Sequence, residues 1–204
     1  MIVIIDYGAG NLRSVVSAII KLGYQPEVTS SPRRVLNAAA VILPGVGAAG
    51  DTMDSLEKLG MSKIIRQLIC GGRPFFAVCV GLQVLFSRTE ERGGHECLGV
   101  IPGIVRRLPS GLKIPHMGWN QVKQTIVHPL FDGIPDESNF YFVHSYYVES
   151  ADMSVVAGTT DYGIPICSMV IKGNLVATQF HPEKSATYGL KLYSNFLKMA
   201  LCER

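Results

Sequence analysis

Cys79 is the residue of this sequence that best fits a catalytic nucleophile. It lies between an apolar run, 74–78, and a segment that begins Val80-Gly81. This pattern predicts a strand-to-helix turn at the cysteine. Such a turn exposes a side chain and directs backbone amides toward it, and a helix N-terminus favours the reactive thiolate. A cysteine in an apolar run is more often an inert core residue. Whether Cys79 is catalytic therefore has to be judged from other segments of the chain.

A thiol nucleophile needs a base, and the base needs a group that orients it. Histidine is the usual base, and the sequence has five histidines, at positions 95, 116, 128, 144 and 181. His181-Pro182-Glu183 follows the apolar run 175–180, and across an extended X-Pro segment the imidazole and the carboxylate can point the same way. Alone, this tripeptide also fits a loop histidine beside a surface glutamate. His95 and His128 lie in polar, turn-like stretches, where we expect surface residues.

The loop Gly45-Val46-Gly47 is a candidate for binding a negative oxygen. It follows the apolar run 40–43, and its small residues let the backbone approach a ligand closely. An N–H group of this loop, together with that of Val80, could hold the oxyanion of a tetrahedral intermediate. Each such donor stabilises a transition state by about 3–4 kcal/mol. A plain tight turn after a strand fits the loop equally well.

The first half of the chain has the alternation that positions such residues. Apolar runs at 2–5, 27–29, 40–43 and 74–78 predict strands. Between them we expect a helix from Leu12 to Gly23 with Asn11 as its N-cap, a short helix from Pro32, and a helix that ends at Gly71-Gly72. This order predicts a parallel sheet with helices on both faces. Ligands bind beyond the carboxyl ends of such strands, so the loops after Ile5, Leu43 and Val78 should meet at one edge.

The second half lacks long helices between its apolar segments. Strands are predicted at 100–105, 122–125, 140–143, 146–149, 155–160, 166–171 and 175–180, with a hairpin turn at 172–174, and a final helix at 187–201. This half is expected to be largely antiparallel and to pack on the same core. Because there is no linker or low-complexity segment, we expect a single domain over residues 1–204.

The composition narrows the class of protein. The chain has 204 residues, of which 48% are hydrophobic and 17% charged, as in a compact globular protein. A net charge of +3 with scattered basic residues argues against nucleic-acid binding. Five cysteines without C-x-x-C spacing argue against disulfides and zinc, so we expect a cytoplasmic location and no metal or cofactor. The N-terminus does not fit a signal peptide, and no run approaches the ~18 apolar residues of a membrane helix.

Several of these segments together resemble the class I, or triad-type, glutamine amidotransferases. The class-wide resemblance rests on Val78-Cys79-Val80-Gly81-Leu82-Gln83 and His181-Pro182-Glu183-Lys184. Within the class, the chain is similar to the glutaminase subunits of imidazole glycerol phosphate synthase, from histidine biosynthesis, in the segments 6–12, 44–47, 113–120 and 142–146. One departure is Ala77, where the class usually has glycine; we expect alanine to be tolerated.

The resemblance implies both a fold and a reaction. The fold is flavodoxin-like, with a central, mostly parallel sheet flanked by helices and an antiparallel portion in the C-terminal half. Cys79 would attack the side-chain amide of glutamine, His181 would transfer protons, and Glu183 would orient His181. The resulting thioester would be hydrolysed to glutamate. The implied oxyanion hole comprises Val46, Gly47 and Val80, and the implied glutamine-binding residues are Gly47, Gln83, Glu91, Ser145 and Tyr146.

The length implies a partner if this resemblance holds. A chain of 204 residues accommodates the glutaminase and leaves no room for a synthase domain, so ammonia must pass to another chain. The resemblance implies a heterodimer with a cyclase subunit, a (β/α)₈ barrel that makes imidazole glycerol phosphate and an aminoimidazole carboxamide ribonucleotide. The docking face is expected to include Asn11, Trp119 and Lys184. Gly118-Trp119-Asn120 is predicted as a loop, and interfaces are enriched in tryptophan.

Two alternatives stay open at this point. A sister glutaminase that feeds another synthase, for pyridoxal phosphate or for a surface sugar, would carry the same triad. A non-catalytic binding subunit with a relic triad is a second alternative, against which the presence of Cys79, His181 and Glu183 argues.

Overall fold

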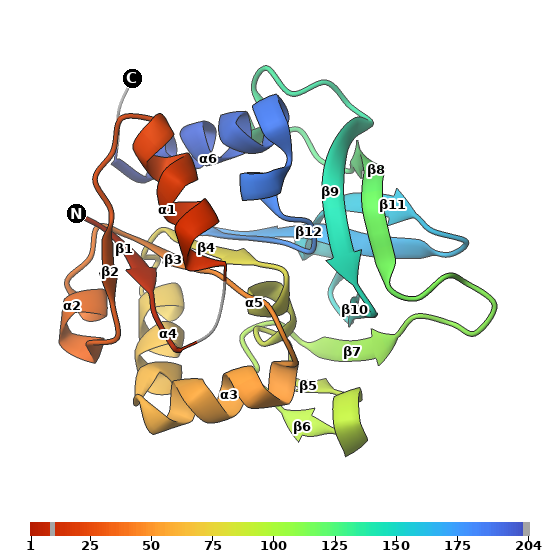
Figure 1. The fold of residues 1–204 in the computed structure, drawn as a ribbon, viewed down its shortest axis with the longest axis horizontal. Coiled ribbons are helices and arrows are strands. Elements are labelled where there is room, and N and C mark those ends of the chain that lie inside the picture. Colours follow the sequence, from red (N-terminus) through yellow and green to blue (C-terminus); the bar gives the residue numbers. More distant parts are fainter. Residues whose placement is uncertain (9–10, 202–204) are drawn as a thin grey trace.

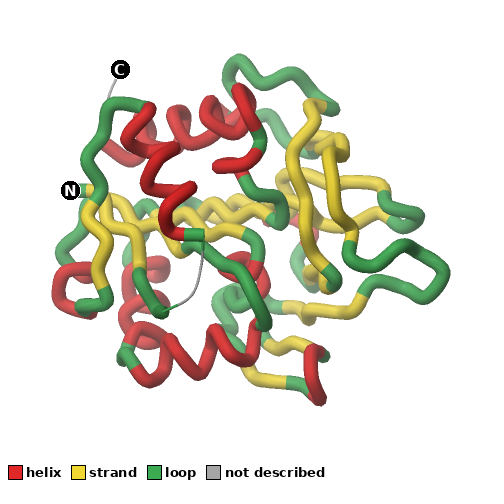
Figure 2. Tube along the Cα trace, in the orientation of Figure 1, coloured by secondary structure: helices red, strands yellow, loops and turns green. Residues whose placement is uncertain are grey.

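The computed structural model describes residues 1–8 and 11–201 of the chain. Ala9 and Gly10 of the predicted opening turn, and Cys202, lie outside the described residues. Figures 1 and 2 show a twisted sheet with helices on both of its faces and a group of strands beyond its right-hand end. Within the described ranges, no helix is long and apolar enough to cross a membrane.

The first half of the chain forms the parallel part of the sheet. Its strands are β1 (Ile2–Ile5), β2 (Glu27–Thr29), β3 (Ala40–Leu43) and β4 (Phe75–Val78), in the order β2-β1-β3-β4. Every residue of β1, β3 and β4 is buried, which explains their uninterrupted apolar sequences. The predicted alternation of strands and helices is confirmed here.

Helices cover both faces of this parallel part. Their bounds are α1 (Leu12–Lys21), α2 (Pro32–Leu36), α3 (Ala49–Lys58), α4 (Met61–Cys70) and, after the final strand, α6 (Ala186–Leu201). Figure 1 shows α1 and α6 on one side of the sheet and α3 and α4 on the other. Helix α3 was not predicted, because its buried face includes the small or polar residues Ala49, Gly50 and Thr52 and lacks a clear apolar stripe.

Strand β13 joins the parallel part to the antiparallel part. β13 (Leu175–Thr178) pairs in parallel with β4 and antiparallel with β12 (Pro165–Lys172). The sheet continues through β10 (Tyr146–Ser150) and β7 (Gly103–Arg107) to the short strands β5 (Arg88–Thr89) and β6 (His95–Glu96). Off this path, β12 pairs with β11 (Val156–Asp161), which leads to β8 (His116–Gln124) and β9 (Ser138–His144). The expected antiparallel second half is therefore confirmed.

The prediction that Gly118-Trp119-Asn120 forms a loop is wrong. These residues lie in β8, where Trp119 pairs with Tyr141 of β9. The glycine and the polar neighbours suggested a loop, but alternate β8 side chains face solvent and tolerate such residues. Strand bounds also differ elsewhere: the strand expected at 100–105 begins at Gly103, the one expected at 122–125 is the end of β8, and the one expected at 175–180 ends at Thr178.

Short 3₁₀ turns complete the connections. They are η1 (Glu91–Gly93), η2 (Pro129–Phe131), η3 (Met153–Val155) and η4 (Pro182–Lys184), and the helix after Cys79, α5 (Val80–Gln83), is only one turn long. His128, expected on the surface, is half-buried. Its ring turns toward the chain, and Nδ1 accepts the N–H of Leu130 at the start of η2. His95 is exposed, as predicted.

Candidate active site

Cys79 occupies a strained turn between β4 and α5. Its φ of 54° and ψ of −106° are unusual for a residue with a side chain, and such strain costs about 1–3 kcal/mol. Neighbouring backbone holds the turn, since the N–H of Cys79 donates to the carbonyl of Thr178 in β13. Glycine is required at Gly45, where a Cβ would lie 2.4 Å from the nitrogen of Gly81 and 2.6 Å from the oxygen of Val78. The 45–47 loop therefore lies directly against the turn.

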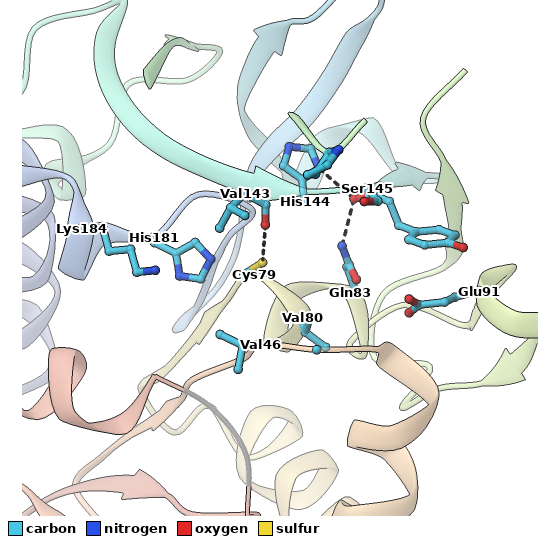
Figure 3. Close-up of a pocket in the computed structure, with 13 residues that line it drawn as sticks. Val46, Cys79, Val80, Gln83, Glu91, Val143, His144, Ser145, His181 and Lys184 are labelled. Carbon is cyan, nitrogen blue, oxygen red and sulfur yellow. Dashed lines mark hydrogen bonds between the residues drawn. The ribbon is translucent and has the colours of Figure 1, made fainter. Parts of the chain in front are cut away.

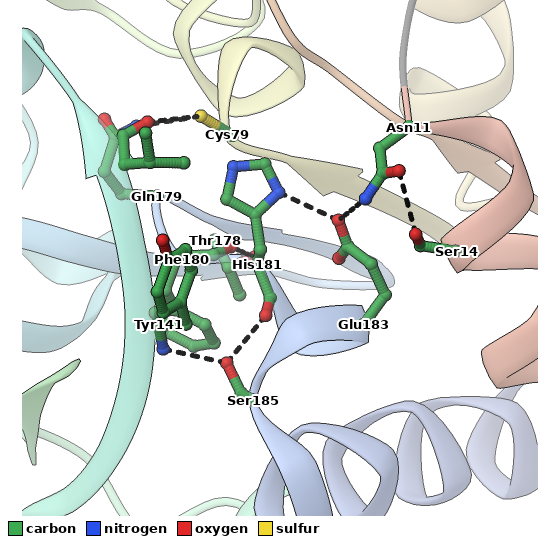
Figure 4. Close-up of polar contacts among 11 residues, drawn as sticks. Asn11, Ser14, Cys79, Tyr141, Thr178, Gln179, Phe180, His181, Glu183 and Ser185 are labelled. Atoms are coloured by element: carbon green, nitrogen blue, oxygen red, sulfur yellow. Dashed lines mark hydrogen bonds and ion pairs between the residues drawn. The ribbon is translucent and has the colours of Figure 1, made fainter. Parts of the chain in front are cut away.

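His181 and Glu183 meet beside Cys79, at the end of the neighbouring strand. Nδ1 of His181 lies 2.8 Å from Oε1 of Glu183, and each side chain is 1% exposed. The one-turn η4 directs both side chains the same way, as the X-Pro spacing predicts. Figure 4 shows the imidazole between the carboxylate of Glu183 and the sulfur of Cys79. The predicted nucleophile, base and orienting carboxylate are thus adjacent.

The environment of His181 favours its protonated form. Burial alone would lower the pKa of His181, but the interactions with Cys79 and with Glu183 outweigh burial and raise that pKa to about 10. Nε2 of the ring has no hydrogen-bond partner at bonding distance within the described residues, which leaves it free to face the sulfur. The ring can therefore hold a proton taken from the thiol and later release it to a leaving group.

Asn11 contacts the histidine–glutamate pair, which the sequence did not predict. Its Nδ2 donates to Oε1 of Glu183 at 3.2 Å, and its Oδ1 accepts from Ser14 Oγ at 2.8 Å. Asn11 is the N-cap residue of α1, as predicted, but its side chain makes no capping bond to the α1 backbone. Two donors now hold one carboxylate oxygen of Glu183 in place.

A pocket of about 450 Å³ opens in front of Cys79. Figure 3 shows it extending from Lys184 and His181, past Cys79, to Gln83 and Glu91. It is lined by the predicted oxyanion-hole residues and by the predicted glutamine-binding residues, namely Val46, Gly47, Val80, Gln83, Glu91, Ser145 and Tyr146. The volume suits a small metabolite.

Comparison with known proteins relates this site to one family. The family model for "Glutamine amidotransferase class-I" matches residues 3–200. The chain belongs to the class I glutamine amidotransferases. It is 58% identical, over all 204 residues and the whole of the relative, to the imidazole glycerol phosphate synthase subunit HisH of Dehalococcoides mccartyi. It is 51% identical to the subunit of that name from Chloroflexus aurantiacus, covering 97% of this chain and 95% of the relative.

Solved structures agree on the amidotransferase fold. The structure titled PurLQS from Thermotoga maritima superposes with a TM-score of 0.78 at 16% identity, covering 97% of each chain. The acivicin-bound glutaminase domain of CTPS from Trypanosoma brucei gives a TM-score of 0.70 at 17% identity, covering 100% of this chain and 94% of that one. At these identities the likeness establishes the fold alone. Ala77, the departure from the class pattern, is buried in β4 between Leu43 and Ala177.

Gln179 is a further residue of this amidotransferase site, and it was not predicted from the sequence. Its Nε2 lies 3.6 Å from Sγ of Cys79, and its Oε1 accepts from Nε2 of Gln83 at 3.2 Å. Nε2 of Gln83 also donates to the carbonyl of Tyr146 at 3.0 Å. The sequence shows only a glutamine directly after the apolar strand β13, and the structure shows that this side chain is fully buried. The buried amides link the thiol to the opposite wall of the pocket.

Two buried histidines near the pocket should make this amidotransferase sensitive to acid. Burial lowers the pKa of His116 to about 4 and that of His144 to about 3, from 6.5. The unfolded chain therefore binds more protons below pH 6.5, and stability falls as the pH falls. Between pH 6.5 and about pH 5, each ring should lower the free energy of unfolding by about 2 kcal/mol. His181, whose pKa is raised, changes stability only above pH 6.5, so it does not contribute in this window.

Urea unfolding at the two pH values, on the parent chain and on His116→Asn, would measure this effect. The variant lacks one of the two titrating rings, so its loss of stability on acidification should be smaller by about 2 kcal/mol. Equal losses in the two proteins would contradict the prediction.

Proposed function

We propose that this chain is the glutaminase subunit of an imidazole glycerol phosphate synthase. It hydrolyses L-glutamine to L-glutamate and ammonia, and the ammonia passes to a cyclase subunit in histidine biosynthesis. The proposal rests on the contact of His181 with Glu183 beside Cys79, in a chain whose full-length relatives at 58% and 57% identity are named as this subunit. A cytoplasmic location suits such a biosynthetic role.

The proposed reaction begins at the sulfur of Cys79. The sulfur, having given its proton to His181, attacks the side-chain amide carbon of glutamine. The tetrahedral intermediate collapses, and His181 gives its proton to the departing ammonia. Water then attacks the thioester, with His181 as the base, and releases glutamate. Glu183 keeps the imidazole oriented and stabilises its positive charge.

The oxyanion hole is proposed to form from backbone N–H groups of the 45–47 loop and of Val80. Gly47 has a positive φ of 96°, and the glycines on both sides of Val46 allow this peptide to reorient at little cost. Val46 and Gly47 both line the pocket beside the thiol.

Val46→Pro tests the oxyanion hole, because proline removes the N–H group. Loss of one donor should lower glutamine turnover at least 100-fold. Affinity for the cyclase subunit, measured by titration calorimetry, should stay the same. Val46→Ala, which keeps the N–H, is the matched control and should retain most of the turnover. Turnover by the proline variant near that of the parent would reject this role.

The proposed docking face adjoins the pocket at Lys184. Trp119 of β8 is 54% exposed and packs its ring edge-on against Tyr141 of β9, with 6.0 Å between centroids. Nζ of Lys184 lies 5.8 Å from the centre of the same Tyr141 ring and also lines the pocket. Met117, 59% exposed, extends the apolar surface along β8. A (β/α)₈-barrel cyclase is the proposed partner, and ammonia would pass to it near Lys184.

Trp119→Ala should weaken binding of the cyclase by about 2 kcal/mol or more, or about 30-fold in Kd. An exposed tryptophan supported by a second ring is the kind of residue that anchors an interface. Titration calorimetry measures the effect. Val127→Ala is a matched control, because Val127 is fully exposed and is outside the proposed face. Equal affinities of the Trp119→Ala and Val127→Ala variants for the cyclase would show that Trp119 is not part of the interface.

The experiment that tests the whole proposal is glutamate production by the purified chain. It is measured alone, and then with a histidine-pathway cyclase and its ribonucleotide ligand. Slow production that rises strongly with both supports the proposal. No response to the cyclase, with Cys79 still labelled by a glutamine-analogue electrophile, would indicate a glutaminase for a different synthase. Absence of labelling would indicate a non-catalytic subunit.

A further inference from the structure

His116 and His144 form a buried pair that the proposed mechanism does not use. Nδ1 of His116 lies 2.9 Å from Nε2 of His144, and the residues are 3% and 5% exposed. They face each other across the first register position of the β8–β9 pair. His144 lines the pocket, whereas His116 lies behind it.

The contacts determine which nitrogens carry protons. Nδ1 of His144 lies 2.9 Å from the carbonyl oxygen of Tyr146, which can only accept, so this nitrogen is protonated. In a neutral ring Nε2 is then an acceptor, so Nδ1 of His116 donates to it. The remaining Nε2 of His116 accepts from Nδ2 of Asn120 at 3.3 Å. Both rings are neutral because burial disfavours their charged forms, and each of the four nitrogens has a partner.

The result is a directional row of hydrogen bonds from β8 to the pocket wall. It runs from Asn120 through His116 and His144 to the carbonyl of Tyr146. The same carbonyl accepts from Gln83, whose amide connects to Gln179 and the sulfur of Cys79. Two donors therefore hold one carbonyl, that of the first residue of β10.

Packing alone does not account for the histidines. The His116 ring stacks between Phe142, at 4.8 Å between centroids, and Tyr162, at 3.9 Å. A phenylalanine would fill this place and stack equally well, without the cost of burying two ring nitrogens. The nitrogens are therefore present for their hydrogen bonds.

We propose that the His116–His144 pair is a positioning element that fixes the Ser145–Tyr146 segment of the glutamine pocket against strand β8. This inference rests on the proposed function, since it takes Ser145 and Tyr146 to bind glutamine. Neither histidine acts on the reacting bond. The pair sets the position of the wall that faces the substrate, so its loss should weaken glutamine binding more than the chemical step.

His116→Phe is the variant that isolates the hydrogen bonds. It keeps the aromatic stacking and removes both ring nitrogens of residue 116. KM for glutamine, assayed in the complex with the cyclase and its ribonucleotide, should rise about tenfold, while kcat changes less than about threefold. In a Cys79→Ser background, which is designed to bind glutamine without hydrolysing it, the Kd of glutamine from calorimetry should rise by the same factor.

His116→Asn is the conservative rescue. Its amide nitrogen can donate to Nε2 of His144 and should return KM to within about threefold of the parent value. Tyr162→Phe is the local control, because it keeps the stacking ring and loses only the hydroxyl bond to the carbonyl of Lys113. It should leave KM unchanged. If His116→Phe does not fold, Asn120→Ala breaks the same row at its outer end and should raise KM about threefold.

The outcomes separate this inference from the proposed function. Glutamine hydrolysis by the parent chain tests the function, and the shifts in KM and Kd test the positioning role. Unchanged KM and Kd in His116→Phe, or in Asn120→Ala, would overturn the inference. Failure of His116→Asn to restore binding would also overturn it, because the loss would then come from packing. An equal loss in Tyr162→Phe would do the same.

Discussion

Replacing Cys79 by serine is expected to lower glutamine hydrolysis at least about 1,000-fold. A serine hydroxyl holds its proton far more tightly than a thiol does, and its environment here is arranged for sulfur. His181 and Glu183 would remain in place, since their contact does not pass through residue 79. Glutamate release, followed by a coupled assay in the presence of the cyclase and its ribonucleotide, measures the loss.

Cys70→Ser is the matched control for this experiment. Cys70 is exposed at the end of α4, away from the pocket, so its replacement should leave hydrolysis unchanged. Cyclase affinity should be the same in both variants because Cys79 is only 4% exposed. Hydrolysis by Cys79→Ser within tenfold of the parent would mean that another residue supplies the nucleophile.

Gly45→Ala is expected to lower hydrolysis at least 100-fold without any change to a triad residue. Its new methyl group would lie 2.4 Å from the nitrogen of Gly81, and backbone cannot move aside as a flexible side chain can. Either the 45–47 loop or the turn at Cys79 must shift, and a shift of about 1 Å at a catalytic group commonly costs 100-fold in rate. Thermal unfolding measured beside the activity separates a displaced site from an unfolded chain.

Gly50→Ala provides the comparison for this substitution. The added methyl group at Gly50 would also lie close to another atom, 2.7 Å away, but that atom belongs to the exposed ring of His95. The ring can rotate away, and alanine favours the helix α3 that contains Gly50. Activity should therefore be retained. Equal losses in the two variants would show that close packing against the Cys79 turn is not what makes Gly45 necessary.

Much of this fold was predictable because local pattern and global burial agree. The fully buried strands β1, β3 and β4 are apolar along their whole length, so their sequences leave little choice of structure. The turn at Cys79 and the pairing of His181 with Glu183 were predictable for a similar reason. Their geometry depends on neighbouring residues in the sequence, a strand-to-helix junction in one case and an X-Pro spacing in the other.

What the sequence did not predict depends on contacts between distant segments. Asn11 and Glu183 are 172 positions apart, and Gln179 reaches Cys79 across 100 positions. No local pattern encodes such pairs. Part of strand β8, around Trp119, was predicted as a loop. Its alternation of exposed and less exposed side chains can be recognised as a strand only when the pairing with β9 is known. The single domain over 1–204, the roles of the site residues and the docking face stay predictions.

The position of β13 in the sheet determines how late in synthesis the surroundings of the Cys79 thiol are completed. This strand lies between β4 and β12, yet it begins only at residue 175 of the chain. Until it is made, the parallel and antiparallel parts have no strand between them, and the carbonyl of Thr178 is not there to hold the Cys79 turn. His181 and Glu183 follow three and five residues after Thr178. A growing chain therefore carries the proposed nucleophile for about half of its synthesis without the proposed base, and the same late segment completes both the sheet and the surroundings of the Cys79 thiol.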